Sequence, residues 1–174
     1  GLISQLDLDR VMSVDGFFTP IKKNGLPVYL TPKVFQWQNE IAEESQKANI
    51  DPTITAAVIS IESQGDPQAI SKAGARGLMQ LMPSNCQSID AFKPQENIGR
   101  GLEVLNENMR YLLGKGIRVD ELLLRAVHMY HTGSSEPYNP DDSYMENFSR
   151  LVSLIQEQAD MFYLQRSGRS EIKW

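Results

Sequence analysis

The sequence predicts a mainly α-helical domain, and three observations support this prediction. Proline follows a helix-capping residue at Thr31-Pro32 and at Asp51-Pro52, a pairing typical of helix starts. Apolar residues then recur at intervals of three and four, which matches the 3.6-residue turn of a helix. No stretch of four or more residues alternates clearly between apolar and polar side chains, as a half-buried strand would. We therefore expect little or no β structure.

The first 30 residues differ from the rest of the chain. Gly16, Pro20 and Gly25 interrupt any long helical periodicity there. We interpret residues 1–30 as an extension that packs on a main domain formed by residues 31–174.

Two helices are predicted near the start of this domain. The first begins at Thr31-Pro32, and the second begins at Asp51-Pro52 and is closed by Gly65. Their apolar stripes are Val34, Trp37, Ile41 and Ala48, and Ile54, Ala57, Val58 and Ile61.

A short helix over residues 77–82 and a longer one starting at Pro94 are predicted next. Pro83 ends the short helix, and Gly114 ends the long one. The stripe of the long helix consists of Ile98, Leu102, Leu105, Met109 and Leu112.

Two further helices complete the prediction. Asp120 is expected to cap the first, and Ser143 with Glu146 forms a capping box for the second. Their stripes are Leu123, Val127 and Tyr130, and Phe148, Leu151, Val152, Ile155 and Phe162. Loops are expected over residues 64–76, 84–93 and 132–142.

Composition excludes several function classes. A length of 174 residues suits one domain, and a net charge of −5 argues against nucleic acid as the main partner. No apolar run approaches the roughly 20 residues that span a bilayer. One cysteine, Cys86, and two histidines, His128 and His131, form no zinc pattern, so we expect no metal. No signal peptide is visible at the start, although the chain opens on Gly1 rather than Met, which leaves export of a longer form open.

Glu62 is the candidate for acid–base chemistry. It follows the apolar stripe of the second predicted helix at the C-terminal end of that helix. Partial desolvation and the negative end of the helix dipole both raise the pKa of a carboxyl group. Such a group can stay protonated near neutral pH and donate a proton to a leaving oxygen. The alternative is an ordinary surface glutamate at a frayed helix end.

The segment that follows favours the catalytic reading. Residues 62–83 read Glu-Ser-Gln-Gly-Asp-Pro-Gln-Ala-Ile-Ser-Lys-Ala-Gly-Ala-Arg-Gly-Leu-Met-Gln-Leu-Met-Pro. This segment resembles, without a gap, the catalytic motif of the soluble lytic transglycosylase (SLT) family. The resemblance covers roughly residues 33–160, and its further matches are Asn97-Ile98, Gly101, Tyr130, Gly133 and Tyr144.

The resemblance implies a lysozyme-like helical fold of the goose-type or SLT kind around a substrate groove. It implies that Ser71, Gln80 and Met82 line a sugar cleft, that Tyr130 places its hydroxyl near Glu62, and that Tyr144 also belongs to the substrate site. Gln80 can donate and accept hydrogen bonds, as sugar N-acetyl and hydroxyl groups require, and Met82 offers an adaptable apolar wall.

Two glycines, Gly74 and Gly77, lie in the same segment. We expect Gly74 and Gly77 to flank a tight turn that lets the backbone approach a sugar closely.

The implied activity is non-hydrolytic cleavage of peptidoglycan. Glu62 would protonate the glycosidic oxygen between N-acetylmuramic acid and N-acetylglucosamine. It would then deprotonate the 6-hydroxyl that closes a 1,6-anhydro ring. The reaction needs no cofactor, and its partners would be peptidoglycan glycan strands in the periplasm or cell envelope, with a role in a cell-envelope assembly left open.

Two alternatives remain at this stage. A goose-type lysozyme would deliver water instead of the internal hydroxyl, but no second carboxylate of the kind that two-carboxylate glycosidases use is evident. Asp66 is close in sequence, and we expect it to cap the turn before Pro67. A non-catalytic peptidoglycan-binding or assembly module is the second alternative, although it would have no need for the acid.

One residue departs from the family pattern. His131 stands where the family motif Ala-Tyr-Asn carries Asn. We expect a structural role for His131 rather than a catalytic one.

Overall fold

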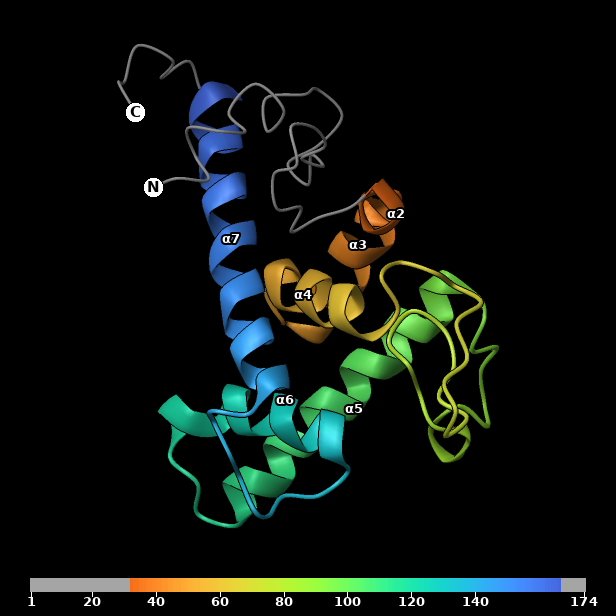
Figure 1. The fold of residues 1–174 in the computed structure, drawn as a ribbon, viewed down its shortest axis with the longest axis vertical. Helices are drawn as coiled ribbons and strands as arrows, with labels where there is room; N and C mark the ends of the chain where they lie inside the picture. The colour runs from red at the N-terminus through yellow and green to blue at the C-terminus, as the bar shows by residue number, and fades with distance from the viewer. Residues whose placement is uncertain (1–31, 167–174) are drawn as a thin grey trace.

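The computed structural model describes residues 32–166, with side chains described over residues 33–157. Its helices are α2 (Pro32–Phe35), α3 (Gln38–Ala48), α4 (Pro52–Glu62), α5 (Pro94–Gly114), α6 (Leu122–Thr132) and α7 (Ser143–Arg166), with two 3-10 turns, η1 (Pro83–Asn85) and η2 (Val119–Glu121) (Figure 1). Apart from helices, the described part of the chain forms two isolated bridges, Ile70 with Arg76 and Arg76 with Leu81. The predicted mainly α-helical class is therefore confirmed.

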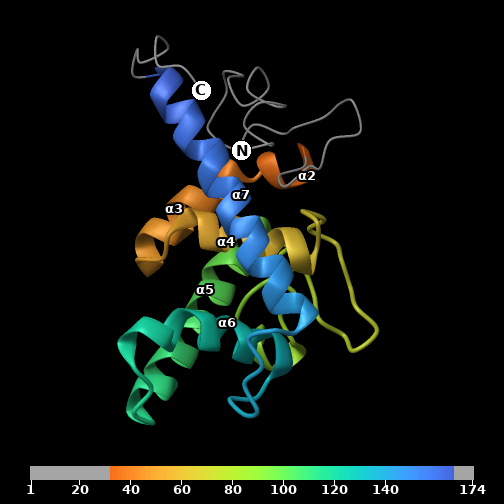
Figure 2. The ribbon, with the colours of Figure 1, turned by 60° about the vertical axis from the view of Figure 1, so that its left-hand side comes forward.

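Helix α4 lies at the centre of the packing. It contacts α7 on one side and α3 on another, while α5 packs against α3 and α6. Figure 2 shows the long helix α7 crossing over α4. Every residue from Thr53 to Ile59 is buried, as expected for a helix enclosed on all sides. The Ser45 and Thr55 hydroxyls meet at 2.7 Å, which satisfies two polar groups in this interior.

The first predicted helix is interrupted. The chain turns at Gln36 and Trp37, between α2 and α3, and the indole Nε1 of Trp37 donates to the Gly65 carbonyl oxygen at 2.9 Å. The Gln36 side chain donates to the Lys33 carbonyl oxygen at 2.8 Å, which occupies a carbonyl left over at the end of α2. The predicted Thr31 cap and the extension over residues 1–30 lie outside the described residues.

The short helix predicted over residues 77–82 is wrong. Gly77 and Gln80 have positive φ angles, 77° and 53°, and these are incompatible with a right-handed helix. The backbone amide of Met79 donates to the Asn97 side chain at 2.7 Å instead of to a helical carbonyl. Pro83 begins the 3-10 turn η1 rather than ending a helix.

Two predicted caps are also wrong. Helix α7 is capped by Asp142, whose carboxylate accepts from the Met145 backbone amide at 2.8 Å, and not by the predicted pair Ser143 and Glu146. Asp120 lies inside η2, and α6 starts after Glu121. The side chain of Phe162 lies outside the described range.

Two general features complete the description. No helix within residues 32–166 is both long and apolar enough to cross a membrane. Cys86 is 9% exposed in a small apolar cluster with Leu81 and Ala91.

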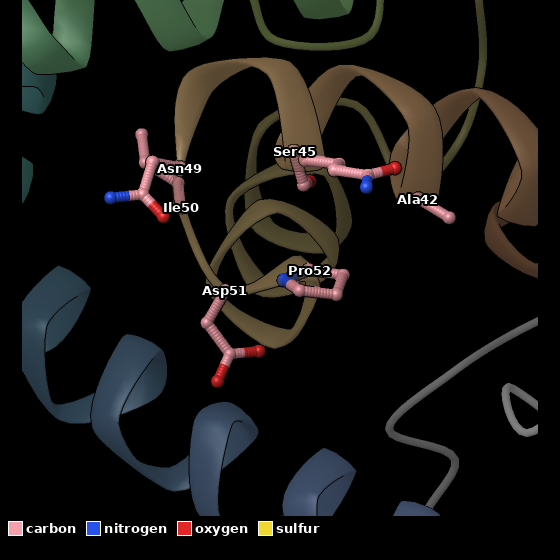
Figure 3. A pocket seen from close by; sticks show the side chains of 7 residues that line it. Ala42, Ser45, Asn49, Ile50, Asp51 and Pro52 are labelled. Carbon is pink, nitrogen blue, oxygen red and sulfur yellow. The ribbon is translucent and has the colours of Figure 1, made fainter.

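A cavity of about 450 Å³ opens at the junction of α3 and α4 (Figure 3). Ser45, Asn49 and Asp51 are among its lining residues. Glu62 stands at the opposite end of α4, about 15 Å away at 1.5 Å per helical residue. The cavity is therefore separate from the predicted acid.

Candidate active site

Glu62 is the last residue of α4 and is half-buried, which confirms its predicted place at a helix end. The chain leaves the helix through Gln64 and Gly65, whose φ angles are 55° and 84°. A side chain at Gly65 would have its Cβ 2.5 Å from the Lys33 carbonyl carbon. The sharp exit therefore depends on glycine, and it leaves Glu62 at the end of a helix that is buried from Thr53 to Ile59.

Burial raises the pKa of Glu62 above its usual value, and a hydrogen bond from Tyr144 opposes the rise. The Tyr144 hydroxyl donates to Oε2 of Glu62 at 2.7 Å. A donor of this kind stabilises the carboxylate form. The carboxyl group thus experiences two opposed influences, of which burial is the larger.

Tyr144 is well suited to remain a donor. It lies in the first turn of α7 and is 7% exposed. Burial raises the pKa of its phenol far above the usual value, and the nearby charge of Glu62 raises it further. The hydroxyl therefore keeps its proton over the whole range in which Glu62 titrates.

The start of α7 is fixed from α6. Asp142, the capping residue, places its Oδ2 3.2 Å from Nε2 of His128. His128 is 4% exposed and lies on α6. This pair ties the first turn of α7, and with it Tyr144, to the neighbouring helix.

Tyr130 lies near enough to Glu62 to feel its charge, as the resemblance implies, but its hydroxyl bonds to the backbone. Its hydroxyl donates to the Met79 carbonyl oxygen at 2.6 Å, so the hydroxyl that contacts Glu62 belongs to Tyr144. Burial raises the pKa of Tyr130 well above its usual value, with the charge of Glu62 as the next cause. The charge of Glu62 thus acts on Tyr130, although the Tyr130 hydroxyl donates its hydrogen bond to the backbone and not to the acid.

Ser71, Gln80 and Met82, the predicted cleft residues in the loop after Glu62, are exposed or half-buried. Ser71 is exposed, and its hydroxyl accepts from the Ala75 amide at 3.0 Å. Met82 is 42% exposed. The Gln80 side-chain nitrogen donates to the Ala69 and Gly77 carbonyl oxygens at 3.1 and 3.0 Å. The donor half of that amide therefore holds the loop, which leaves the expected sugar contact to its carbonyl oxygen.

Asn97 organises this loop from α5. The residue is fully buried, and its carbonyl oxygen accepts from the Met79 amide at 2.7 Å. Its nitrogen donates to the Arg76 and Ala91 carbonyl oxygens at 3.0 and 2.8 Å. A single side chain thus satisfies three backbone groups. The sequence indicated Asn97 only through the family pattern, because an asparagine in a helix has no local feature that reveals such contacts.

Gly77 leaves room for the hydrogen bonds that Asn97 makes to this loop. A Cβ there would lie 2.3 Å from Nδ2 of Asn97 and 2.2 Å from the Ala91 carbonyl oxygen. A side chain at residue 77 is therefore excluded by the protein's own packing, and the approach of this turn to a sugar stays a prediction. At Gly74, where φ is 94°, a Cβ would meet Cγ of Pro83 at 4.0 Å, an ordinary contact.

His131 contacts the site in a way the sequence did not indicate. Its ring stacks on that of Tyr144, with centroids 3.9 Å apart and planes inclined by 12°. Burial lowers the pKa of His131, Asp142 raises it and His128 lowers it. No periodicity or motif connects residues 131 and 144, since the contact depends on how α6 and α7 meet.

Other acidic groups stand apart from Glu62. Asp66 accepts from the Gln68 amide at 2.9 Å, which confirms its role in the turn. Among residues 33–157, burial and Tyr144 account for the shift of the Glu62 pKa, with no contribution from another carboxylate. The described side chains include no group of three or more His, Cys, Asp or Glu that could hold a metal ion.

Replacing Tyr144 by Phe is expected to raise the pKa of Glu62. The substitution removes the hydroxyl that stabilises the carboxylate and leaves the burial, which is the larger cause, in place. A ¹³C NMR titration of the side-chain carboxyls measures this, with Glu62→Gln to assign the resonance. An unchanged or lower pKa in Tyr144→Phe would show that the hydrogen bond does not control the acid.

Comparison with known proteins agrees with the geometry. Residues 39–146 match the family "Transglycosylase SLT domain". A transglycosylase of Enterobacteria phage PRD1 is 42% identical over 77 residues, which is 42% of this chain and 29% of that protein.

Two bacterial relatives give a similar picture. Endo-type membrane-bound lytic murein transglycosylase A of Klebsiella pneumoniae is 47% identical over 53 residues, 30% of this chain and 26% of the relative. Membrane-bound lytic murein transglycosylase E of Buchnera aphidicola is 30% identical over 115 residues, 58% of this chain and 54% of the relative. The alignments thus span between 26% and 54% of the length of these two relatives. Because the family match covers more than half of the chain, including Glu62, Tyr130 and Tyr144, the protein belongs to the transglycosylase SLT domain family.

Proposed function

We propose that this protein is a peptidoglycan lytic transglycosylase with Glu62 as its catalytic acid and base. The observation that carries the proposal is a half-buried carboxyl group whose pKa is raised by burial and which accepts a hydrogen bond from Tyr144 at 2.7 Å. A raised pKa favours the protonated form of a carboxyl group, which is the form that can release a proton to a leaving oxygen. The family membership supplies the substrate class.

The first step would break the bond between C1 of N-acetylmuramic acid and the oxygen of the next N-acetylglucosamine. The proton of Glu62 passes to that oxygen, which leaves as a hydroxyl. The substrate's N-acetyl group stabilises the positive charge at C1, so no protein nucleophile is required.

In the second step, the 6-hydroxyl oxygen of the same muramic acid bonds to C1, and its proton passes to Glu62. The acid is thereby regenerated and no water is consumed. Internal attack of this kind has an effective concentration on the order of 10⁵ M or more in well-oriented cases.

Tyr144 supports both steps under this proposal. Between them Glu62 is a carboxylate, and the phenol hydroxyl is placed to stabilise that charge with a hydrogen bond. Because the phenol stays protonated, it can donate throughout the cycle. We assign Ser71, Gln80 and Met82 to the wall of the sugar groove, with the Gln80 carbonyl oxygen as an acceptor for sugar N–H or O–H groups.

The hydrolytic alternative of a goose-type lysozyme finds less support. An inverting hydrolase uses a second carboxylate about 6.5–9.5 Å from the acid to activate water. Asp66 is engaged in its own turn, and Asp142 caps α7 and faces His128.

The chemistry of the substrate would place the activity at the cell envelope, with glycan strands as the partner.

The products of a digest separate these possibilities. We expect purified peptidoglycan treated with the protein to release fragments that end in 1,6-anhydro-N-acetylmuramic acid. Mass spectrometry identifies them because each is lighter by one water than the same fragment from a parallel digest with a hydrolysing lysozyme. Fragments that all carry reducing ends would establish the lysozyme alternative. Binding to the wall without release of fragments would establish a non-catalytic module.

A further inference from the structure

The flat contact between His131 and Tyr144 lies one side chain away from the proposed acid. The two ring centroids are 3.9 Å apart at an angle of 12°, and the Tyr144 hydroxyl at the far end of the ring donates to Glu62. We propose that His131 is a positioning residue, which acts on Glu62 by holding the Tyr144 phenol in place. The catalytic meaning of this role rests on the proposed function.

The phenol requires such support because its hydroxyl lies at the tip of the side chain. A small rotation about χ1 moves the tip out of hydrogen-bond range, and rotamer preference restricts χ1 only to broad wells. The backbone of Tyr144 is fixed by the Asp142 cap two residues earlier. The ring itself is bounded on one face by His131, which blocks rotation of the phenol toward that face.

The support comes from a different helix than the phenol. His131 lies in the last turn of α6 and Tyr144 in the first turn of α7. The pair of His128, which is buried, and Asp142, which is half-buried, joins the same two helix ends. The stack therefore rests on a junction that is already fixed, and this allows a ring–ring contact to position a hydroxyl.

The neutral form of the imidazole suffices for this role. Burial lowers the pKa of His131, while Asp142 raises it and His128 lowers it. Glu62, Tyr130 and Asp142 are the titratable groups that act on the Tyr144 side of the stack. A flat ring rather than a charge is the property the contact needs. Asparagine, which the family motif carries at this position, has no ring to supply it.

The test uses His131→Phe, which keeps a flat ring, together with His131→Ala and His131→Asn, which remove it. We expect Ala and Asn to lower kcat about tenfold with little change in KM, since a hydrogen bond to a charged group is weakened. We expect Phe to retain the wild-type rate. In a Tyr144→Phe background, none of the three substitutions should lower kcat further, because the hydroxyl that they position is already gone.

A second readout does not depend on turnover. By ¹³C NMR titration, the pKa of Glu62 should rise in His131→Ala, as in Tyr144→Phe, and stay at the wild-type value in His131→Phe. This result decides the positioning role even if the digest releases no anhydro fragments and the proposed function fails.

Three outcomes would overturn the inference. One is an unchanged Glu62 pKa in His131→Ala, whether or not the melting temperature falls. Another is a loss of activity in His131→Phe equal to that in His131→Ala. The third is an equal loss from His131→Ala with and without the Tyr144 hydroxyl.

Discussion

Replacing Glu62 by Gln is expected to lower the rate of peptidoglycan cleavage by at least about 10²–10⁴-fold, the usual contribution of a positioned acid or base. Glutamine has nearly the same shape and its carbonyl oxygen can still accept from Tyr144, but it cannot transfer a proton. The measurement is release of soluble fragments from purified peptidoglycan. Activity near the wild-type level in a folded Glu62→Gln would remove Glu62 from the mechanism.

The matched control is Glu44→Gln on the neighbouring helix α3. Glu44 is 9% exposed and accepts from Lys47 at 3.0 Å. The control removes the same charge from a glutamate that is more deeply buried than Glu62. We expect it to leave cleavage unchanged, although its melting temperature falls with the loss of the ion pair. Equal losses of activity in the two variants would point to a general effect of charge or folding.

Glu62→Gln should also change the pH dependence of stability. Because folding raises the pKa of Glu62, the carboxyl contributes to stability at low pH, and this contribution is lost as the pH rises through the raised pKa. Glutamine does not titrate. The melting temperature of the variant relative to wild type should therefore increase from acid to neutral pH, which calorimetry can follow.

The helices that sequence predicted best are those with a local start and a long apolar stripe. Asp51-Pro52 and Pro94 mark the beginnings of α4 and α5 correctly, because a proline at the first turn and a repeating apolar face act within the segment itself. Residues 77–82 carry apolar residues of the right kind, yet their backbone is held by Asn97, 18 residues beyond Met79. A contact between residues this far apart in the sequence outweighs local helix propensity, and it produces no periodic pattern from which it could be predicted.

The site was predictable only in part for the same reason. Glu62 could be found from its motif and from its place at a helix end. Its hydrogen bond to Tyr144 joins residues 82 apart in sequence, and the stack on His131 depends on the meeting of two helix ends. The resemblance indicated both Tyr130 and Tyr144, but it did not show that the Tyr130 hydroxyl bonds to the Met79 carbonyl oxygen while that of Tyr144 bonds to Glu62.

Replacing Asn97 by Ala is expected to lower the free energy of unfolding by about 3–5 kcal/mol. The Met79 amide and the Ala91 carbonyl oxygen lose their buried partner, while the Arg76 carbonyl oxygen loses one bond and keeps the Leu81 amide as a donor. Each buried polar group left unsatisfied costs about 1–3 kcal/mol before relaxation, and a lost hydrogen bond adds about 1 kcal/mol. Urea unfolding at neutral pH measures the change. Asn106→Ala on the same helix is the control, since its side chain makes one hydrogen bond, to the Ala48 carbonyl oxygen at 3.0 Å, worth about 1 kcal/mol.

The loss should be concentrated in the loop that follows the acid. The peptide groups on either side of Met79 are held by two different side chains, the amide by Asn97 and the carbonyl oxygen by Tyr130. Without Asn97, the Met79 amide should lose its protection from hydrogen exchange. Amides in the middle of α4 should still exchange only through global unfolding, at the rate set by the lower free energy of unfolding of the variant. The displaced loop carries Gln80 and Met82, so cleavage should fall as well, with a larger effect on KM than on kcat because the acid and Tyr144 lie on other elements. A Met79 amide that stays protected, or a destabilisation no greater than that of Asn106→Ala, would show that the loop is held by its apolar contacts and not by Asn97.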